Sequence, residues 1–494
     1  MTINDSNRAL ETRTDQVDVP GGCFVDGRWL TASEGPPLRV HDPADGRLIA
    51  ELPSAGAAQT AAAVHAAAAA YPAWSALSAA QRGEPLRRAH ALLLERADDL
   101  ALVMTREQGK PLSEARGEVL WGAEYLLWYA EEIRRSQGVT VPGDGPGHRI
   151  EVRRRPRGVV ACITPWNFPS AMLLRKLAPA LAAGNTVVAK PAEQTPLSAI
   201  KIFEVLEEAG LPAGVANLVC GDPVVVGDAL CGAAEVRHIS FTGSKQVGRM
   251  LLGRGAGQLK KVTVELGGVA PFVVFADADL ELAVGKLMDA KFANAGQSCV
   301  APNRLLVQRE VADELSERLC ARVSALELGN GSADGTEVGP LIDTAAVAKV
   351  RRHLSDALAG GGRVLSGGSP TVGLSEDRFF TPTVLTDVPN GALVLREETF
   401  GPLLPLEQFT DEAAVLSTAN ASEAGLGAYV FTRDLGRAHR MAEALEYGMV
   451  AVNDASFGYV QAPFGGIKAS GDGREGGQDG LREYQDLQYL NINF

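Results

Sequence analysis

A turn of small residues at 292–300 (FANAGQSCV) contains the first candidate for chemistry, Cys299. A cysteine in an exposed turn can act as a nucleophile once it is activated as the thiolate. The alternative is a buried cysteine that serves as a small apolar residue. Glu265 ends a strand-like segment before two glycines (TVELGG, 263–268), where partial burial would raise its pKa toward that of a general base. A solvated carboxylate at a strand end is the alternative for Glu265.

The segment 164–169 (TPWNFP) places two prolines, two aromatic residues and an amide directly after an apolar strand. The side chain of Asn167 can donate a hydrogen bond to a developing oxyanion, together with the backbone N–H of Cys299. A structural turn built by the two prolines is the alternative. No G-x-S-x-G segment accompanies a Ser-His-Asp arrangement, which argues against a serine hydrolase.

Two further segments have the residue types that bind a nucleotide. In 241–248 (FTGSKQVG) a strand leads into a helix, Gly243 lets the backbone approach a phosphate, and the free N–H groups at the helix start attract anions. In 190–193 (KPAE) a cation and a carboxylate end a strand of the same unit, where Glu193 can accept hydrogen bonds from both hydroxyls of an adenosine ribose. The alternatives are an ordinary strand-to-helix turn and a surface charge pair.

The composition excludes several classes of protein. A chain of 494 residues is too long for one simple core, so two or three domains are expected, and 46% hydrophobic residues exclude disorder throughout. The net charge of −13 argues against a nucleic-acid partner. The seven histidines and six cysteines show neither metal-ligand spacing nor a C-x-x-C pair, so no metal site is expected. A polar N-terminus and the lack of a long apolar run predict a cytoplasmic protein with no membrane partner.

Helical patterning dominates the N-terminal part of the chain. An alanine-rich helix is predicted from 57 to 71, where Pro72 should stop it, and helical patterning continues from 79 to 136. The Gly/Pro-rich segment 138–147 is expected to be a break between domains.

From 158 to 252, short apolar strands alternate with helices, which predicts βαβ units and a parallel sheet. Such sheets bind ligands at the carboxyl ends of their strands, where the candidate segments lie. A second alternation from about residue 270 predicts a second α/β domain. The tail 484–494 alternates apolar residues without a local partner, so we expect a strand that adds to the sheet of another subunit.

Seven short motifs, in this order along the chain, resemble those of the aldehyde dehydrogenase superfamily. They are TPWNFP at 164–169, KPAE at 190–193, FTGS at 241–244, ELGG at 265–268, GQSC at 296–299, EETFGP at 397–402 and PFGG at 463–466. The resemblance covers nearly the whole chain. It implies an α/β fold with a Rossmann-type cofactor domain, an α/β catalytic domain and a β oligomerisation arm.

The resemblance also implies domain boundaries and an assembly. The expected units are an NAD-binding domain at 1–133 and 157–267, a catalytic domain at 268–478, and an arm at 134–156 and 479–494. In this family pattern the arm pairs subunits, so a homodimer or homotetramer is expected.

The resemblance assigns roles in the NAD(P)-dependent oxidation of an aldehyde to a carboxylic acid. Cys299 would form a thiohemiacetal and then a thioester, and its N–H and the Asn167 side chain would hold the oxyanion. Glu265 would activate the water that hydrolyses the thioester, and Glu475 would relay protons. The implied cofactor contacts are Thr164, Pro165, Trp166, Lys190, Glu193, Gly243, Ser244, Leu266, Glu398 and Phe400. Because Glu193 should repel a 2′-phosphate, NAD is favoured over NADP.

Within the superfamily the chain is most similar to succinate-semialdehyde dehydrogenases, which bind the substrate carboxylate with two arginines and a serine. One arginine matches Arg175, whereas the second falls at Ala293 and the serine at Gly458. A cysteine two residues after the nucleophile in that subfamily is Ala301 here. The implied substrate contacts are Phe168, Arg175, Ser298, Val300, Gly458 and Phe464.

These departures predict a larger, anionic aldehyde with Arg175 as its only anchor, because losing one charged donor weakens carboxylate binding by about 1.5–3 kcal/mol. A salt bridge on the helix surface is the alternative for Arg175. Other functions left open are a broad-specificity enzyme for neutral or aromatic aldehydes, a CoA-acylating relative, a cofactor-independent cysteine thioesterase or acyltransferase, and an inactive binding protein. The intact set of Cys299, Glu265 and Asn167 argues against the last of these.

Overall fold

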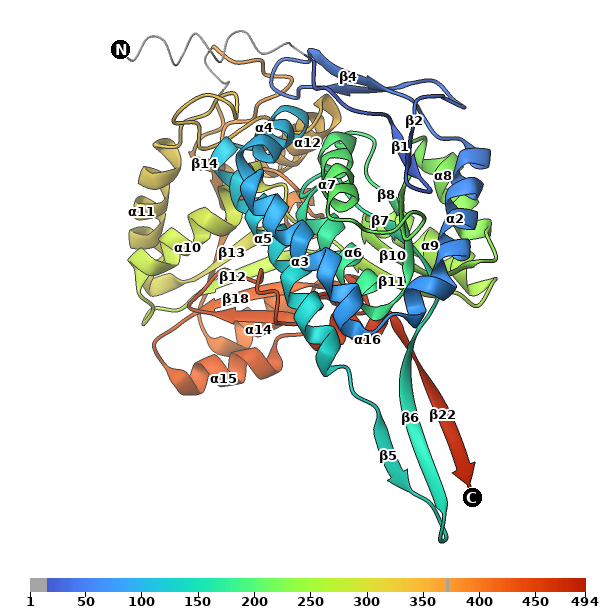
Figure 1. Cartoon of the computed structure of the whole chain (residues 1–494). Helices are drawn as coiled ribbons and strands as arrows, with labels where there is room; N and C mark the ends of the chain where they lie inside the picture. The colour runs from blue at the N-terminus through green and yellow to red at the C-terminus, as the bar shows by residue number, and fades with distance from the viewer. Residues whose placement is uncertain (1–15, 370–372) are drawn as a thin grey trace, which may run out of the picture.

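Two β-sheets organise the chain, and helices cover them (Figure 1). The computed structural model describes residues 16–369 and 373–494; residues 1–15, the polar start from which no secretory leader is expected, lie outside the described residues. Among the described residues, no helix combines the length and the apolar character that crossing a bilayer requires.

The first sheet has the strand order β2-β1-β9-β8-β7-β10-β11-β21. Its strands are β1 (Cys23–Val25), β2 (Arg28–Leu30), β7 (Val159–Ile163), β8 (Thr186–Lys190), β9 (Ala216–Leu218), β10 (Val236–Gly243), β11 (Lys261–Leu266) and β21 (Gly471–Asp472). The strands from β9 to β11 are parallel, so their carboxyl ends lie along one edge. The alternation predicted for 158–252 is therefore observed, and Lys190, Gly243 and Glu265 all lie at or near that edge.

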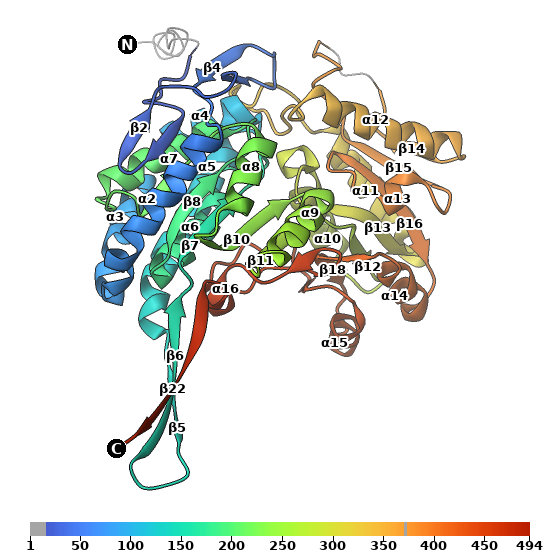
Figure 2. The same ribbon diagram turned by 90° about the vertical axis from the view of Figure 1, so that its right-hand side faces the viewer.

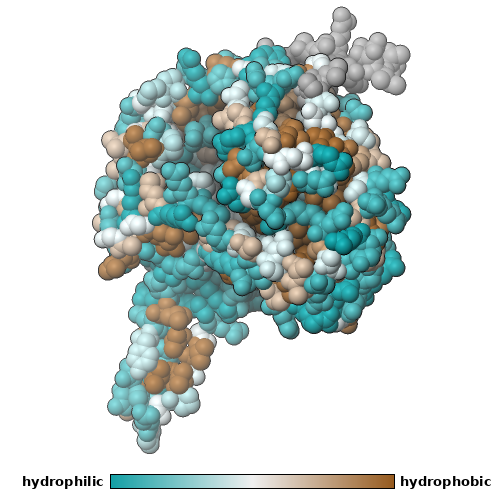
Figure 3. All heavy atoms as spheres, turned by 180° about the vertical axis from the view of Figure 1, so that it is seen from behind, coloured by the Kyte–Doolittle hydropathy of each residue, from teal (hydrophilic) through white to brown (hydrophobic). Residues whose placement is uncertain are grey.

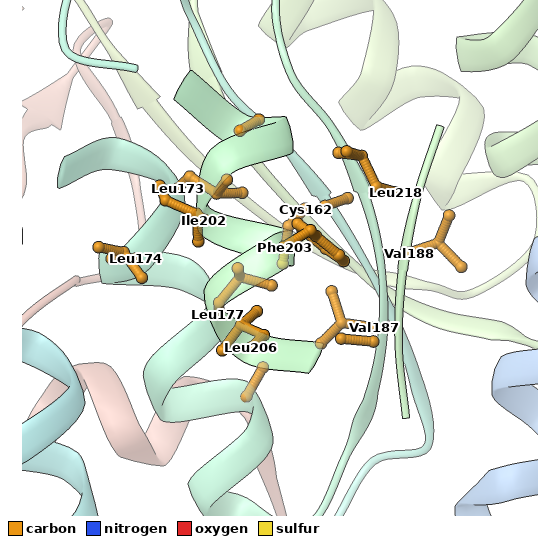
Figure 4. Close-up of a cluster of buried hydrophobic side chains, with 14 of the residues drawn as sticks. Cys162, Leu173, Leu174, Leu177, Val187, Val188, Ile202, Phe203, Leu206 and Leu218 are labelled. Atoms are coloured by element: carbon orange, nitrogen blue, oxygen red, sulfur yellow. The ribbon is translucent and has the colours of Figure 1, made fainter. Parts of the chain in front are cut away.

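Helices pack on this sheet and on one another. They are α2 (Ala57–Ala76), α3 (Ala79–Glu95), α4 (Ala97–Gln108), α5 (Leu112–Glu132), η1 (Ile133–Arg135), α6 (Ala171–Ala183), α7 (Pro196–Glu208), α8 (Pro223–Gly232) and α9 (Lys245–Ala256). Apolar side chains of α6 and α7 meet those of β7, β8 and β9, among them Leu177, Phe203 and Val187 (Figure 4). Such continuous apolar strands are typical of a parallel sheet that is covered by helices.

The predicted stop of the first helix at Pro72 is wrong, because α2 continues to Ala76. A proline inside a helix removes only its own N–H from the hydrogen-bond ladder. Beyond it, Trp74 is buried and its Nε1 donates to the carbonyl of Leu181 over 3.2 Å. This anchoring contact holds the last turn in helical conformation.

The second sheet has the order β14-β15-β16-β13-β12-β18-β19, parallel throughout except for β14. Its strands are β12 (Ala270–Val274), β13 (Pro302–Gln308), β14 (Arg363–Ser366), β15 (Thr383–Thr386), β16 (Leu403–Phe409), β18 (Gly427–Phe431) and β19 (Met449–Val452). The helices of this part are α10 (Leu280–Phe292), η2 (Ala293–Gly296), η3 (Arg309–Val311), α11 (Ala312–Ser324), α12 (Thr344–Ala359), α13 (Leu393–Arg396), α14 (Glu412–Asn420) and α15 (Leu435–Ala444). The second α/β unit predicted from residue 270 is thus observed.

Short elements complete the described chain. They are the hairpin β3 (Leu38–His41) and β4 (Leu48–Leu52), the pair β17 (Ala424–Gly425) and β20 (Ile467–Lys468), and the helix α16 (Gly477–Glu483). Strand β21 lies within 268–478 in sequence but pairs with β11, so the second unit contributes one strand to the first sheet. The exact domain boundaries stay a prediction.

A three-stranded arm projects from the body (Figures 1 and 2). It consists of β5 (Val139–Pro142), β6 (His148–Pro156) and the C-terminal β22 (Gln485–Asn493), in the order β22-β6-β5. The tail was expected to lack a partner strand nearby and to add to the sheet of another subunit. Instead, it pairs with β6 of its own chain from Gln485 to Asn493, because the fold brings two distant segments together. This leaves β22 and β5 as the two outer strands of the arm.

One face of the arm is apolar. Register places Tyr489 and Val139 on either side of Val152, and Val141 beside Ile150. Val139 and Tyr489 are 60% and 62% exposed. Figure 3 shows apolar side chains gathered on the projecting arm.

Candidate active site

A cavity of about 270 Å³ lies where the carboxyl ends of β10 and β11 face the turn after α10 and the segment 397–402. Its wall brings together residues from five of the seven motifs: Pro165, Trp166, Asn167, Gly243, Ser244, Glu265, Leu266, Cys299, Glu398 and Phe400. The two sheets thus contribute to one cavity, with the predicted nucleophile, base and amide donor on its wall.

Glycines let the walls of this cavity approach closely. A Cβ atom on Gly267 would lie 2.3 Å from both carboxylate oxygens of Glu398, and the backbone N–H of Gly268 donates to Glu398 over 3.2 Å. The rings of Trp166 and Phe400 meet edge to face with their centroids 5.4 Å apart. The segments 267–268 and 397–400 are therefore fixed against each other through Glu398.

Cys299 is presented by a tight turn. Asn294, Ala295 and Gly296 all have left-handed φ values, of +50°, +53° and +72°, although only the last is a glycine. Backbone strain of this kind is found where the surrounding structure enforces a functional geometry. Burial raises the pKa of the Cys299 thiol to about 12, against the opposing field of Arg175. The resting side chain is therefore a thiol that needs a base.

Glu265 has the environment of such a base. It is only 4% exposed, and neither carboxylate oxygen has a hydrogen-bond partner among the described residues. Burial, followed by repulsion from Glu475, raises the pKa of Glu265 well above its usual range. A carboxyl group held this way is a stronger base than an exposed glutamate.

The amide of Asn167 is already oriented. Its Nδ2 donates one hydrogen bond, 3.0 Å long, to the carbonyl of Gln297, two residues before Cys299. The second hydrogen of that amide is free for a ligand oxygen. The same side chain lines the cavity next to Cys299, which is the placement that an oxyanion donor requires.

Glu475 and Arg175 do not line the cavity, and the structure places them in an internal ion pair. Arg175 Nε lies 2.6 Å from Glu475 Oε2, its side chain is fully buried, and its guanidinium stacks 4.1 Å above the ring of Phe464. Lys176 pairs with the other oxygen of Glu475 and with Ser240. Burial would raise the pKa of Glu475, but Lys176 and Arg175 hold it below its usual range.

A second cavity, of about 240 Å³, is lined by Phe168, Ser298 and Val300, three of the predicted substrate contacts. Of the remaining three, Arg175 lies in the ion pair with Glu475, Phe464 packs in an apolar cluster next to Cys299, and the carbonyl of Gly458 accepts a 2.6 Å hydrogen bond from Trp121. Because Ser298 and Val300 flank Cys299 in the chain, this cavity lies next to the nucleophile turn.

The sequence motifs do not include the charged residues that line the second cavity. Lys286 lies on its wall with Asp289 and Asp454, and Lys286 Nζ pairs with Asp454 Oδ1 over 2.7 Å. The available signal was helical spacing, since 286 and 290 share one face of α10, and 293 follows directly after the end of that helix. The site of the missing arginine, Ala293, lies on the same wall.

Lys190, Glu193 and Thr164 lie outside both cavities, at the end of β8 and β7. Lys190 is buried, with Nζ 3.5 Å from Glu193 Oε2, and the Glu193 side chain is 38% exposed. The hydroxyls of Thr164 and Thr242 are buried without a hydrogen-bond partner among the described residues. These hydroxyls can hydrogen-bond a bound dinucleotide, and Gly243 at the end of β10 lets its phosphates approach the backbone.

Lys349 and Ala346, three residues apart on α12, also line the first cavity and were missed, because no motif contains them. Burial raises the pKa of Glu398 to about 7, and Lys349 opposes this rise. No cluster of three or more possible metal-ligating His, Cys, Asp or Glu residues is found in the part of the chain that the structure describes.

Comparison with known proteins identifies the class that this fold and site define. Residues 29–490 match the model of the aldehyde dehydrogenase family, so the chain belongs to that family. It is 50% identical to a glutarate-semialdehyde dehydrogenase of Pseudomonas putida over 95% of this chain and 97% of the relative. It is 48% identical to the succinate-semialdehyde dehydrogenase [NADP(+)] GabD of Escherichia coli, over the whole of both chains.

The solved structures agree. The crystal structure of succinate-semialdehyde dehydrogenase from Burkholderia pseudomallei superposes with a TM-score of 0.95 at 46% identity, covering 97% of this chain and 100% of that one. The expected family and fold are confirmed. Family membership makes the chain an oxidoreductase of aldehydes and sets aside the cofactor-independent thioesterase or acyltransferase.

The raised pKa of Cys299 predicts how this thiol is alkylated. Below its pKa, the thiolate fraction grows about tenfold per pH unit, so iodoacetamide should label Cys299 in the cofactor-free enzyme faster at every step from pH 7 to pH 9.5. Mass spectrometry of the peptide that contains Cys299 measures the rate, with Cys299→Ala as the control. A labelling rate that levels off near pH 7 would show a low-pKa thiolate and contradict this environment.

Proposed function

We propose that this enzyme oxidises an aldehyde with a distal anionic group to the carboxylic acid, through covalent intermediates on Cys299. The observation that carries the proposal is the shared cavity of Cys299, Glu265 and Asn167, beside a second cavity that can hold the rest of the substrate. A bound nicotinamide dinucleotide supplies the hydride acceptor.

In the proposed first half-reaction, Glu265 removes the thiol proton of Cys299, and the sulfur attacks the aldehyde carbon. The resulting oxyanion accepts hydrogen bonds from the Asn167 amide and the Cys299 N–H. Its collapse expels a hydride and leaves a thioester on the sulfur. Splitting the oxidation in this way replaces one difficult step by two easier ones.

Before the second half-reaction, Glu265 releases the thiol proton to solvent. It then takes a proton from the water that attacks the thioester, and returns this proton to the Cys299 thiolate as that group leaves. Glu475 supports Glu265 electrostatically. Its charge, kept by Arg175 and Lys176, makes Glu265 more basic. The proton-relay role expected of Glu475 stays a prediction. Because Glu265 acts in its ionised form, turnover should rise with pH through the raised pKa of Glu265.

NAD is the proposed preferred cofactor, on the strength of Glu193 at the end of β8. A carboxylate there accepts hydrogen bonds from the ribose hydroxyls and repels a 2′-phosphate. The name of the Escherichia coli relative specifies NADP(+), so a useful rate with NADP is compatible with family membership. The neighbouring Lys190 can serve either cofactor.

Replacing Glu193 by Ser should raise kcat/KM for NADP relative to NAD by about tenfold, which corresponds to roughly 1.4 kcal/mol of removed repulsion. Steady-state kinetics with both cofactors measure the ratio. Glu204→Ser is the matched control, because Glu204 lies on α7 in an ion pair with Lys201. A ratio that stays unchanged in Glu193→Ser would refute the assigned role.

The substrate proposal is supported by the names of the two relatives, which both denote semialdehydes of dicarboxylic acids. Two cations are near enough to receive the distal carboxylate. Lys286 lines the second cavity, and Arg175, the anchor expected from the sequence, lies behind Phe464 in its pair with Glu475. To bind substrate directly, Arg175 would have to exchange Glu475 for the substrate, and Lys286, which already lines the cavity, would have to exchange Asp454.

A panel of aldehydes with and without a distal carboxylate, sulfonate or aromatic ring tests this assignment. We expect the anionic members to be favoured in kcat/KM, and Lys286→Met to lower kcat/KM for them about tenfold while neutral aldehydes are unaffected. Lys286→Arg, which keeps the charge, is the control, and Arg175→Gln tests the second cation. Equal rates on neutral aldehydes in the unaltered enzyme would instead indicate broad specificity.

We further propose that the arm pairs copies of this chain into a dimer or tetramer. Its apolar face and the free edge of β22 are the support, since an exposed strand edge invites pairing with another chain. The cytoplasmic location stays a prediction.

Truncation after Glu483 removes β22 and should convert the oligomer to smaller species in light scattering coupled to size-exclusion chromatography. The double variant Leu487→Lys/Tyr489→Lys should do the same, because it charges the apolar face without removing the strand. Gln488→Lys, on the opposite face, is the matched control. An oligomer of unchanged size in both altered proteins would show that the arm has another role.

A further inference from the structure

A buried polar cluster lies directly behind the segment that contains Asn167. Lys110 follows the end of α4, and its side chain is 1% exposed. Its Nζ donates to the backbone carbonyl of Asn167 over 2.8 Å and pairs with Glu118 Oε2 over 2.5 Å. The same ammonium lies 4.1 Å above the centre of the Phe168 ring. One cation thus contacts two consecutive residues, the oxyanion donor and a wall of the substrate cavity.

Glu118 ties this cation to helix α6. Its Oε1 accepts hydrogen bonds from the backbone N–H groups of Ser170 and Ala171, 2.9 and 3.1 Å long, at the start of the helix. A carboxylate at a helix N-terminus is stabilised by the free N–H groups and by the helix dipole. Lys110 and Glu118 therefore clamp the segment 167–171 from α5 and the α4–α5 connection.

Asn294 holds the same carbonyl from the other side. Its Nδ2 donates to the Asn167 carbonyl over 2.9 Å, and its Oδ1 accepts from Gln108 Nε2 over 2.9 Å. Asn294 is also the first residue of the left-handed turn that presents Cys299. The carbonyl of Asn167 is thus bonded to two donors, while its side chain donates to Gln297 in the nucleophile turn.

This arrangement restricts Asn167 at both ends. With the carbonyl held by Lys110 and Asn294, and one amide hydrogen by Gln297, the second amide hydrogen has a single direction left. An oxyanion donor is effective only when its direction is set before the reaction, and a misplacement of about 1 Å can cost about 100-fold in rate.

We propose that Lys110, anchored by Glu118 and assisted by Asn294, is a positioning residue that aims the Asn167 amide at the reacting oxygen. This inference rests on the proposed role of Asn167 as the oxyanion donor. Lys110 lines neither cavity, so its effect on the reaction passes through the residues it contacts, Asn167 and Phe168, and a double-mutant cycle with Asn167 isolates the first of these.

A double-mutant cycle between Lys110→Met and Asn167→Ala tests the proposal. In the otherwise unaltered enzyme, Lys110→Met should lower kcat about 10- to 100-fold, while KM for the cofactor stays within about threefold. In the Asn167→Ala background the same substitution should lower kcat less than about twofold, because no amide is left to aim. A purely structural Lys110 would lower kcat equally in both backgrounds, which would overturn the proposal.

Loss of Lys110 alone leaves Glu118 as an unpaired buried charge, so Lys110→Met/Glu118→Gln serves where the single variant folds poorly. Glu107→Gln is the matched control. Glu107 is likewise buried and caps α7 through Leu197 and Ser198, but it makes no contact with Asn167. It should lower the melting temperature without the fall in kcat.

Two outcomes separate this inference from the proposed function. A native kcat in Asn167→Ala would refute the oxyanion role of Asn167 and, with it, the basis of the inference. A strongly reduced kcat in Asn167→Ala together with a native kcat in Lys110→Met would refute the positioning role alone.

Discussion

The unequal treatment of two buried carboxylates is the electrostatic feature on which the site depends. Glu475 lies between Arg175 and Lys176 and is kept ionised. Glu265 has no hydrogen-bond partner among the described residues, and both burial and the charge of Glu475 raise its pKa. Removing one partner from a buried ion pair is strongly destabilising, so Arg175 and Lys176 are expected to stay paired with Glu475. Pairs of carboxylates whose environments separate their pKa values are typical of acid–base sites.

The architecture makes this arrangement possible by bringing two sheets to one cavity. Parallel strands end at a shared edge, which places Glu265 and Gly243 together, and the left-handed turn at 294–296 delivers Cys299 from the second unit. The segment 164–170 connects the two, since it is clamped by Lys110 and Glu118 behind and bonded to Gln297 in front. The chemistry and the packing therefore depend on the same short segment.

Much of the fold was predictable, because apolar strands and amphipathic helices alternate clearly between 158 and 308. The continuation of helix α2 beyond Pro72 was not predictable, because it depends on the contact of Trp74 with Leu181, more than a hundred positions away in the chain. The family resemblance grouped the tail with 134–156 in one arm, but the strand pattern of the tail alone could not show that it pairs with β6 of its own chain.

The motifs predicted which residues meet in the first cavity, because each motif has a local pattern of glycines and polar groups. Lys110, Lys286 and Lys349 could not be found in this way. Their roles come from long-range contacts, with Asn167, Asp454 and the cavity beside Glu398, and lysines are otherwise most often solvated. Arg175 was found, but its burial against Glu475 could not be foreseen from a match in one helix.

The account is tested most directly by trapping the acyl group on the sulfur. In a Glu265→Gln variant, mixed with aldehyde and oxidised cofactor at about pH 9.5, where a larger fraction of the Cys299 thiol ionises without a base, the thioester should still form, more slowly, while its hydrolysis should fail. Rapid mixing should then give about one reduced nicotinamide per active site, and mass spectrometry should locate the acyl mass on the peptide that contains Cys299. An unmodified Cys299 peptide after such a burst, or aldehyde oxidation at the native rate by Cys299→Ala, would contradict covalent catalysis at this residue.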